Sequence, residues 1–124
     1  MKKLLLAAAA LTSAASFAGS ADMERAFFDK IVEMQQHNRL SIHLDEKCKY
    51  LKPNVRNELE VASKKAGQLI LAHPMNNMGS GANTFVDVKM HERSQEIPCN
   101  NKAKAQVEDT LRIARQFMVI MNQS

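Results

Sequence analysis

From Met23 onward, apolar residues recur along the chain with helical spacing. One such series consists of Met23, Phe27, Ile31 and Met34. Steps of three and four positions place side chains on one side of a helix, where they can pack against a core. Ser20 precedes the series, and its side-chain oxygen is suited to capping free N–H groups in the first turn. We therefore expect a helix over residues 21–37.

Two later segments show the same spacing. The first carries Val55, Leu59, Ala62, Ala66, Leu69 and His73. Asn54 is a suitable N-cap, Pro74 follows the series, and a residue before proline avoids helical angles, so we expect a helix over 55–73. The second carries Ala103, Val107, Leu111, Ala114, Phe117 or Met118, and Met121. Asn101 is placed to cap this last helix.

The stretch after residue 39 carries two apolar patterns. Leu40, Ile42 and Leu44 alternate with polar residues, which is typical of a strand. A longer series at helical spacing consists of Leu40, Leu44, Cys48 and Leu51. Because the helical series is longer, we expect a helix, or a bent continuation of the first one, to about Tyr50.

The stretch 74–101 reads as irregular, because glycines and prolines interrupt it. Within it, Val86, Val88 and Met90 alternate with polar residues, which predicts a short half-buried strand. Thr84 with Asp87 three positions later also forms a capping-box pattern, and a helical turn from residue 85 is the competing prediction. A loop of this length in a small domain is often functional.

Together these elements predict an all-α fold, a small bundle of three to four helices. A short β ribbon of 40–44 with 85–90 would make the domain α+β instead. Cys48 and Cys99 are the only two cysteines. In an exported protein such a pair is more often bonded than free, so we expect one disulfide between them to staple the bundle.

The N-terminal residues have the order of a secretion signal. Lys2 and Lys3 precede an unbroken apolar run over 4–11, and small residues follow up to Ala18. The run is shorter than the roughly 20 residues that span a bilayer. We expect residues 1–18 to be a cleavable signal peptide, cut after about Ala18, with Ala15 or Ala21 as alternatives. Residues 19–124 then form a single domain in the periplasm or outside the cell.

The net charge of the chain adds little to this prediction. The two lysines of the signal belong to 17 basic residues, which leaves 15 against 13 acidic residues in the remaining chain. So small a positive excess does not indicate binding to nucleic acid. After the signal, no apolar run is long enough to span a membrane.

Methionine and histidine supply one candidate metal site. His73, Met75 and Met78 place an imidazole and two thioethers within six residues, and these are ligands that Cu(I) selects. The spacing alone does not define a site, so the competing interpretation is a loop packed on the edge of the domain. We expect no other cofactor.

No sequence motif indicates catalysis. The histidines do not fall in a metalloprotease pattern, and no glycine-rich phosphate loop is present. His43 and Asp45 have a spacing that can orient an imidazole, but no nucleophile accompanies them. Carboxylate pairs such as Asp45 with Glu46, and the lysines around Cys48, are interpreted as solvated charge. We therefore expect a protein that is not an enzyme.

The sequence favours a small exported binding protein whose partner is another protein in the periplasm, in an inhibitor, immunity or chaperone-like role. The expected partner-binding loop contains Met75, Met78, Phe85, Met90 and His91, because methionine-rich surfaces adapt to partners. A Cu(I)-binding carrier is the alternative function, and a homodimer stays open. In size, signal and cysteine pair the chain resembles immunity proteins and acid-stress chaperones, small exported helical domains with one disulfide.

Overall fold

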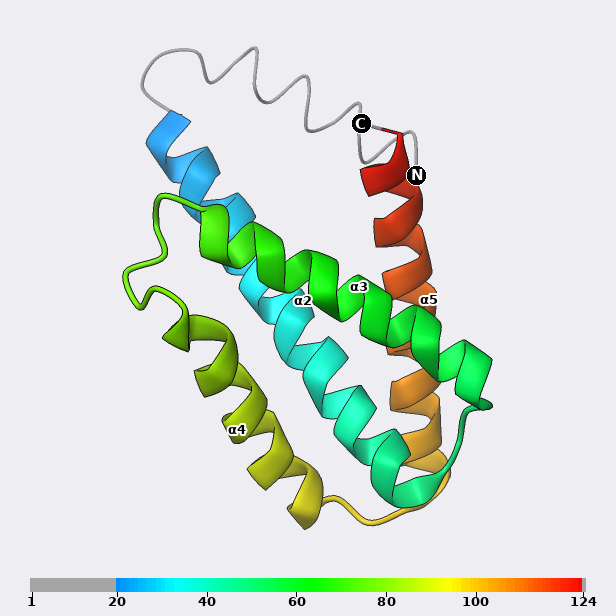
Figure 1. The fold of residues 1–124 in the computed structure, drawn as a ribbon. Helices are drawn as coiled ribbons and strands as arrows, with labels where there is room; N and C mark the ends of the chain where they lie inside the picture. Colours follow the sequence, from blue (N-terminus) through cyan, green and yellow to red (C-terminus); the bar gives the residue numbers. More distant parts are fainter. Residues whose placement is uncertain (1–19, 124) are drawn as a thin grey trace.

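The computed structural model describes residues 20–123, so the expected signal peptide lies outside the described residues. Four helices account for most of this part, and it contains no strand: α2 (Ser20–Cys48), α3 (Pro53–Ala72), α4 (Gly81–Glu96) and α5 (Asn101–Asn122). Figure 1 shows them as a bundle with short connections. The predicted all-α fold is confirmed, and the alternative β ribbon is wrong.

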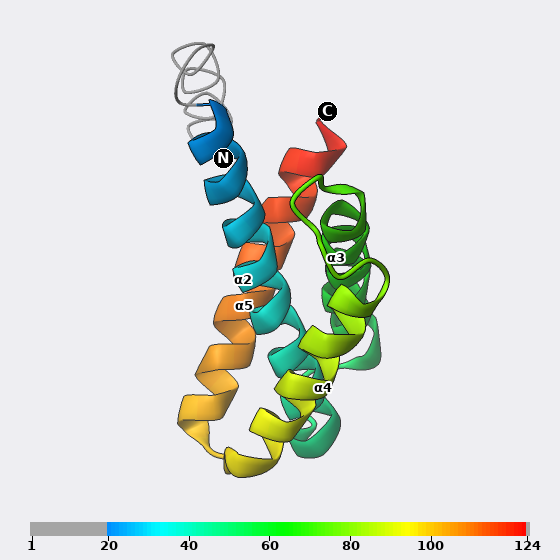
Figure 2. The same ribbon diagram turned by 90° about the vertical axis from the view of Figure 1, so that its left-hand side faces the viewer.

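The longest helix, α2, is the centre of the bundle. It has 29 residues, which corresponds to about 43 Å. The other three helices all pack against it, whereas α3 and α4 contact each other less, and the two views agree on this arrangement (Figures 1 and 2). The expected continuation of the first helix is confirmed as one unbroken helix.

The strand-like alternation over 40–44 has a helical explanation. Leu40 and Leu44 are one turn apart and join a cluster with Val107 of α5, while Ile42 joins a second, larger cluster. A central helix that is buried on two sides carries apolar residues at closer intervals than a surface helix does. The alternation of apolar and polar residues therefore arises because this helix has two buried faces.

The prediction of an irregular stretch over 74–101 is wrong for most of its length. Residues 81–96 form α4, and the loop before it covers only 73–80. The strand expected at 86–90 is absent, and the competing helical prediction is right except that the helix begins at Gly81. Thr84 lies inside the helix and does not cap it. Residues 97–100 form the short link to α5.

Two caps differ from expectation, by one residue in α5 and by two in α3. Asn100 caps α5 in place of Asn101, because its Oδ1 accepts a hydrogen bond from the backbone N–H of Ala103 at 2.9 Å. Pro53 occupies the first turn of α3, where its missing N–H has no helical partner to lose, and Lys52 takes the N-cap position of Asn54.

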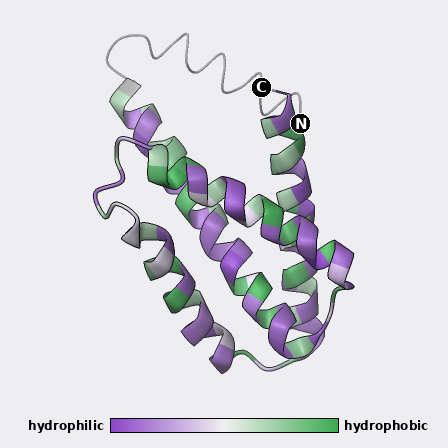
Figure 3. Cartoon of the chain, in the orientation of Figure 1, coloured by the Kyte–Doolittle hydropathy of each residue, from purple (hydrophilic) through white to green (hydrophobic). Residues whose placement is uncertain are grey.

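The core lies between α2, α3 and α5. Its larger cluster contains Ile31, Ile42, Leu59, Ala62, Ala66, Ile70, Ala82, Leu111, Ala114 and Phe117. Figure 3 shows that polar and apolar residues mix along each helix, as expected where one side faces water. Among the described residues, no helix has the length and hydropathy of a membrane span.

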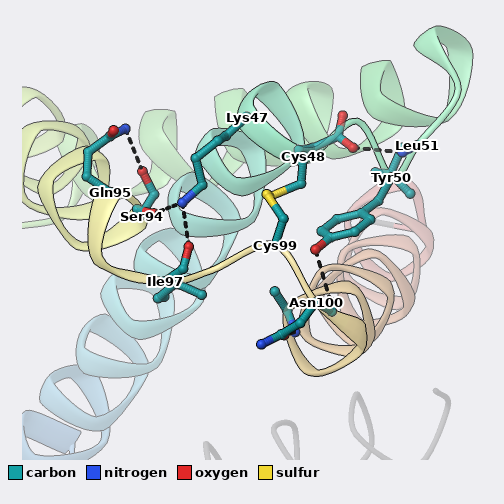
Figure 4. The surroundings of a disulfide bond; sticks show 11 residues. Lys47, Cys48, Tyr50, Leu51, Ser94, Gln95, Ile97, Cys99 and Asn100 are labelled. Atoms are coloured by element: carbon teal, nitrogen blue, oxygen red, sulfur yellow. Dashed lines mark hydrogen bonds between the residues drawn. A yellow bond between two sulfur atoms is a disulfide. The ribbon is translucent and has the colours of Figure 1, made fainter.

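The predicted disulfide is confirmed. Cys48 at the end of α2 is bonded to Cys99 just before α5, with 5.6 Å between their Cα atoms (Figure 4). Lys47 adds to the same junction by donating from Nζ to the carbonyl oxygens of Ser94, at 2.7 Å, and Ile97. This lysine was expected to be solvated charge, but it ties the end of α4 to α2.

Candidate functional site

An open groove of about 530 Å³ lies between α3 and α4. Gln35 and Arg39 of α2 form its floor, since α3 and α4 both rest on α2 and diverge above it. Leu71 from the last turn of α3 and Thr84 from the first turn of α4 line its walls. The volume is within the range of ligand sites, but most of the residues that line the groove are polar or charged, whereas small-molecule pockets are lined mostly by hydrophobic and aromatic side chains.

The floor is fixed by hydrogen bonds between α2 and α3. Gln35 donates from Nε2 to the Ser63 carbonyl oxygen at 3.0 Å and accepts from the Ser63 hydroxyl at 3.1 Å. Arg39 donates to the same hydroxyl at 3.3 Å. Gln35 and Ser63 are both buried, and a buried polar group that is fully paired keeps its position.

Gly67 allows the helices to approach at the middle of the groove. A Cβ atom at this position would lie 3.1 Å from Nδ2 of Asn83 and 3.3 Å from Nε2 of Gln35. Asn83 uses the space to donate from Nδ2 to the Gly67 carbonyl oxygen at 3.0 Å. Its Oδ1 is buried and has no hydrogen-bond partner. The sequence analysis did not identify Gly67 as important, because a single glycine inside a helix gives no specific signal.

Charged groups join α2 to α4 next to the groove floor. Oδ1 of Asp87 lies 2.7 Å from Nε of Arg39 and 2.8 Å from Nε2 of His43. Partial burial alone would raise the pKa of the Asp87 carboxyl. The hydrogen bonds from His43 and Arg39 outweigh this effect and hold that pKa below its usual value of 3.8.

The other nitrogen of His43 also has close neighbours. Its Nδ1 lies 3.0 Å from Oε1 of Glu46 and 3.4 Å from Nδ1 of His91, and the two imidazole rings meet edge to face. A neutral imidazole has one N–H donor and an imidazolium has two. Only the protonated ring therefore carries a charge that pairs with both carboxylates.

The expected relation between His43 and Asp45 is wrong. Asp45 is buried and accepts hydrogen bonds from the backbone N–H of Leu51 at 2.7 Å and from Nε of Arg56 at 2.9 Å. The carboxylates near His43 are Asp87, 44 residues away, and Glu46. No local pattern in a single sequence could reveal a contact between residues so far apart.

The proposed copper ligands lie at the end of α3 and in the loop that follows. The His73 ring packs against Phe28, with ring centroids 4.8 Å apart, and its Nδ1 accepts the backbone N–H of Met75 at 3.1 Å. The neutral ring then carries its proton on Nε2, so coordination at either nitrogen requires this hydrogen bond to break. Met78 is half exposed. The copper hypothesis stays a prediction.

The residues expected in one partner-binding loop belong to two elements. Met75 and Met78 are in the loop 73–80, whereas Phe85, Met90 and His91 are on α4. Met78 and Phe85 are exposed, each at 51 %. Met90 packs against the smaller core cluster, and His91 faces His43. Met78 and Phe85 are therefore the two apolar members that are open to a partner.

The last turn of α3 and the helix α4 carry further exposed apolar side chains. Leu71 and Val88 are exposed at 45 % and 50 %, and Lys89 places its Nζ 5.7 Å from the centre of the Phe85 ring. We call Leu71, Met78, Phe85 and Val88 the 71–88 surface. It runs from the last turn of α3 through the loop into α4, and Leu71 joins it to the groove.

The chemistry available in this region is polar contact and ion pairing. Both cysteines are in the disulfide, and in residues 20–123 no three His, Cys, Asp or Glu side chains are grouped so as to hold a metal ion. Comparison of the chain with protein-family models, curated proteins and solved structures gave no significant match. The site therefore has to be interpreted from its own geometry.

Proposed function

We propose that the protein is a small exported binding protein, not an enzyme, that acts on another protein in the periplasm and contacts it through the 71–88 surface and the adjoining groove. The observation that supports this most directly is the exposure of four large apolar side chains along one continuous segment. Exposed apolar side chains that are bordered by polar groups are typical of protein–protein contact sites.

The groove next to this surface fits the same role. Its floor consists of polar groups that already bond to one another, so they can meet a partner without rearrangement, and pre-organised surfaces lose less entropy on binding. The Oδ1 atom of Asn83 differs from these groups, because it is buried and accepts no hydrogen bond.

The first experiment places a photo-crosslinking amino acid at Leu71 and, separately, at Ile113. Ile113 is the matched control, because it is also a partly exposed aliphatic residue on a helix, but it belongs to α5. In cells that export the protein, we expect position 71 to form one discrete crosslinked species with another protein. Position 113 should not form it.

Binding is then measured with the purified partner by calorimetry. Leu71→Glu and Phe85→Glu each place a charge in the apolar contact and should weaken binding at least about tenfold, which is near 1.4 kcal/mol. Ile113→Glu should leave the affinity unchanged. Equal crosslinking at both positions, or equal affinity for all three variants, would refute the proposed surface.

A further inference from the structure

The helix α4 is held to the bundle by little apolar burial. Its fully buried residues are Ala82, Val86 and Ser94, whereas α3 and α5 each bury six residues that include larger side chains such as Leu59 and Phe117. Two small apolar residues supply a modest hydrophobic contribution. The position of α4 on α2 therefore depends strongly on its polar contacts.

Those polar contacts differ along the helix. At the C-terminal end, Lys47 donates to the carbonyl oxygens of Ser94 and Ile97, and the disulfide follows at Cys99. Neither contact depends on a carboxylate. In the first half of α4, the contacts are the Asn83 hydrogen bond to Gly67 and the Asp87 carboxylate between Arg39 and His43.

The groups around Asp87 carry mostly positive charge when protonated. Arg39 and His43 of α2 contact it directly. Glu46 of α2 and His91 of α4 lie beside His43. Glu60 and Lys64 of α3 line the same groove. Asp87 is the anion that directly contacts both Arg39 and His43. Glu46 is more exposed and touches only the far side of the His43 ring.

We propose that α4 is an acid-released clamp: protonation of Asp87 leaves the cations Arg39, His43 and His91 facing one another, and the first half of α4 then separates from α2 while its C-terminal end stays tied by Lys47 and the disulfide. Like charges at these distances repel, and between α2 and α4 the closest such pair is His43 with His91.

The sign of the pH dependence follows from Asp87. Because the folded state holds the pKa of this carboxyl below its usual value, the carboxylate stabilises the closed state at neutral pH, and this contribution is lost as the pH falls through the lowered pKa. The clamp is thus closed at neutral and mildly acidic pH and opens in strong acid. Opening would uncover Val86 and Met90 and widen the groove, whatever the protein binds there.

Hydrogen exchange measured by mass spectrometry on the disulfide-bonded protein tests the clamp. Protection of residues 81–96 is compared with that of residues 101–122 at about pH 7 and about pH 2, after correction for intrinsic exchange rates. We expect α4 to lose at least about tenfold more protection than α5 in acid. Equal loss in both helices would mean that acid unfolds the whole domain, and it would overturn the proposal.

Asp87→Asn reproduces the neutral side chain at every pH and should open α4 at a higher pH than the wild type does. Asp109→Asn is the matched control, since Asp109 pairs with Arg112 on the surface of α5 and joins no two helices. An Asp87→Asn variant whose exchange pattern equals that of the wild type at every pH tested would overturn the proposal.

His43→Gln keeps a donor for Asp87 but removes one cation, so it provides a test even if the Asp87 variant does not fold. The acid-induced loss of α4 protection should shrink by about tenfold relative to wild type. His37→Gln, at an exposed position of the same helix, should behave as wild type. A full acid response in His43→Gln would rule out charge repulsion as the cause.

Discussion

Asp45 illustrates how one buried carboxylate fixes the connection between two helices. Its side chain is 3 % exposed and accepts from the Leu51 N–H and from Arg56 in the first turn of α3, while its own carbonyl oxygen accepts from Lys49. Lys49 has a positive φ of 58°, an unfavourable conformation for a residue with a Cβ. The hydrogen bonds made by Asp45 hold the chain in this turn.

Replacing Asp45 by alanine should therefore be among the costliest single changes. The Leu51 N–H and the Arg56 guanidinium would lose their acceptor, and removal of one partner from a buried ion pair costs about 3–5 kcal/mol. Urea unfolding measures the loss. Asp109→Ala removes an exposed pair and should change stability by less than about 1 kcal/mol. Equal effects would show that Asp45 is not the anchor described.

At the residue scale, sequence reasoning succeeded where one residue type has one dominant role. The two cysteines are an example, because an isolated pair in an exported chain has few alternatives. It failed for Asp45 and Lys47, which stand among other charged residues and therefore resemble solvated charge. It also missed the contact of His43 with Asp87, which depends on how α2 and α4 pack.

At the scale of elements, α4 was the hardest to predict. The side of α4 that faces α2 and α3 carries Asn83, Asp87 and Ser94 as well as Ala82 and Val86, so it has no continuous apolar stripe. The alternation of Val86, Val88 and Met90 then dominated the pattern, although Val88 faces water. The other three helices were found because each carries apolar residues at helical spacing over several turns.

A pair of substitutions distinguishes the helix from the strand that the alternation suggested. In a strand, Val86 and Val88 would share one face and contribute alike, whereas in α4 they are 8 % and 50 % exposed. We expect Val86→Ala to lower the free energy of unfolding by about 1.5 kcal/mol and Val88→Ala to change it by less than about 0.5 kcal/mol. Similar losses for both variants would contradict the helical assignment.

At the scale of the molecule, the disulfide joins distant parts of the chain at one end of the bundle. It links the end of the central helix to the junction between α4 and α5, and α4 buries little apolar surface of its own. The bond closes a loop over a sequence separation of 51 residues, which includes all of α3 and α4. Its main effect in the chain-entropy model is to restrict the unfolded chain.

The double variant Cys48→Ser with Cys99→Ser should therefore lose about 4 kcal/mol of stability with little change in the folded structure. For a domain of this size that is a large part of the usual total. Urea unfolding followed by circular dichroism measures both quantities, because the midpoint reports stability and the starting signal reports helix content.

Reduction of the wild type with a thiol is the control for the substitutions themselves. If helix content at neutral pH falls in both cases, the bond holds the folded state together directly. An unchanged midpoint would mean that the core of α2, α3 and α5 needs no staple.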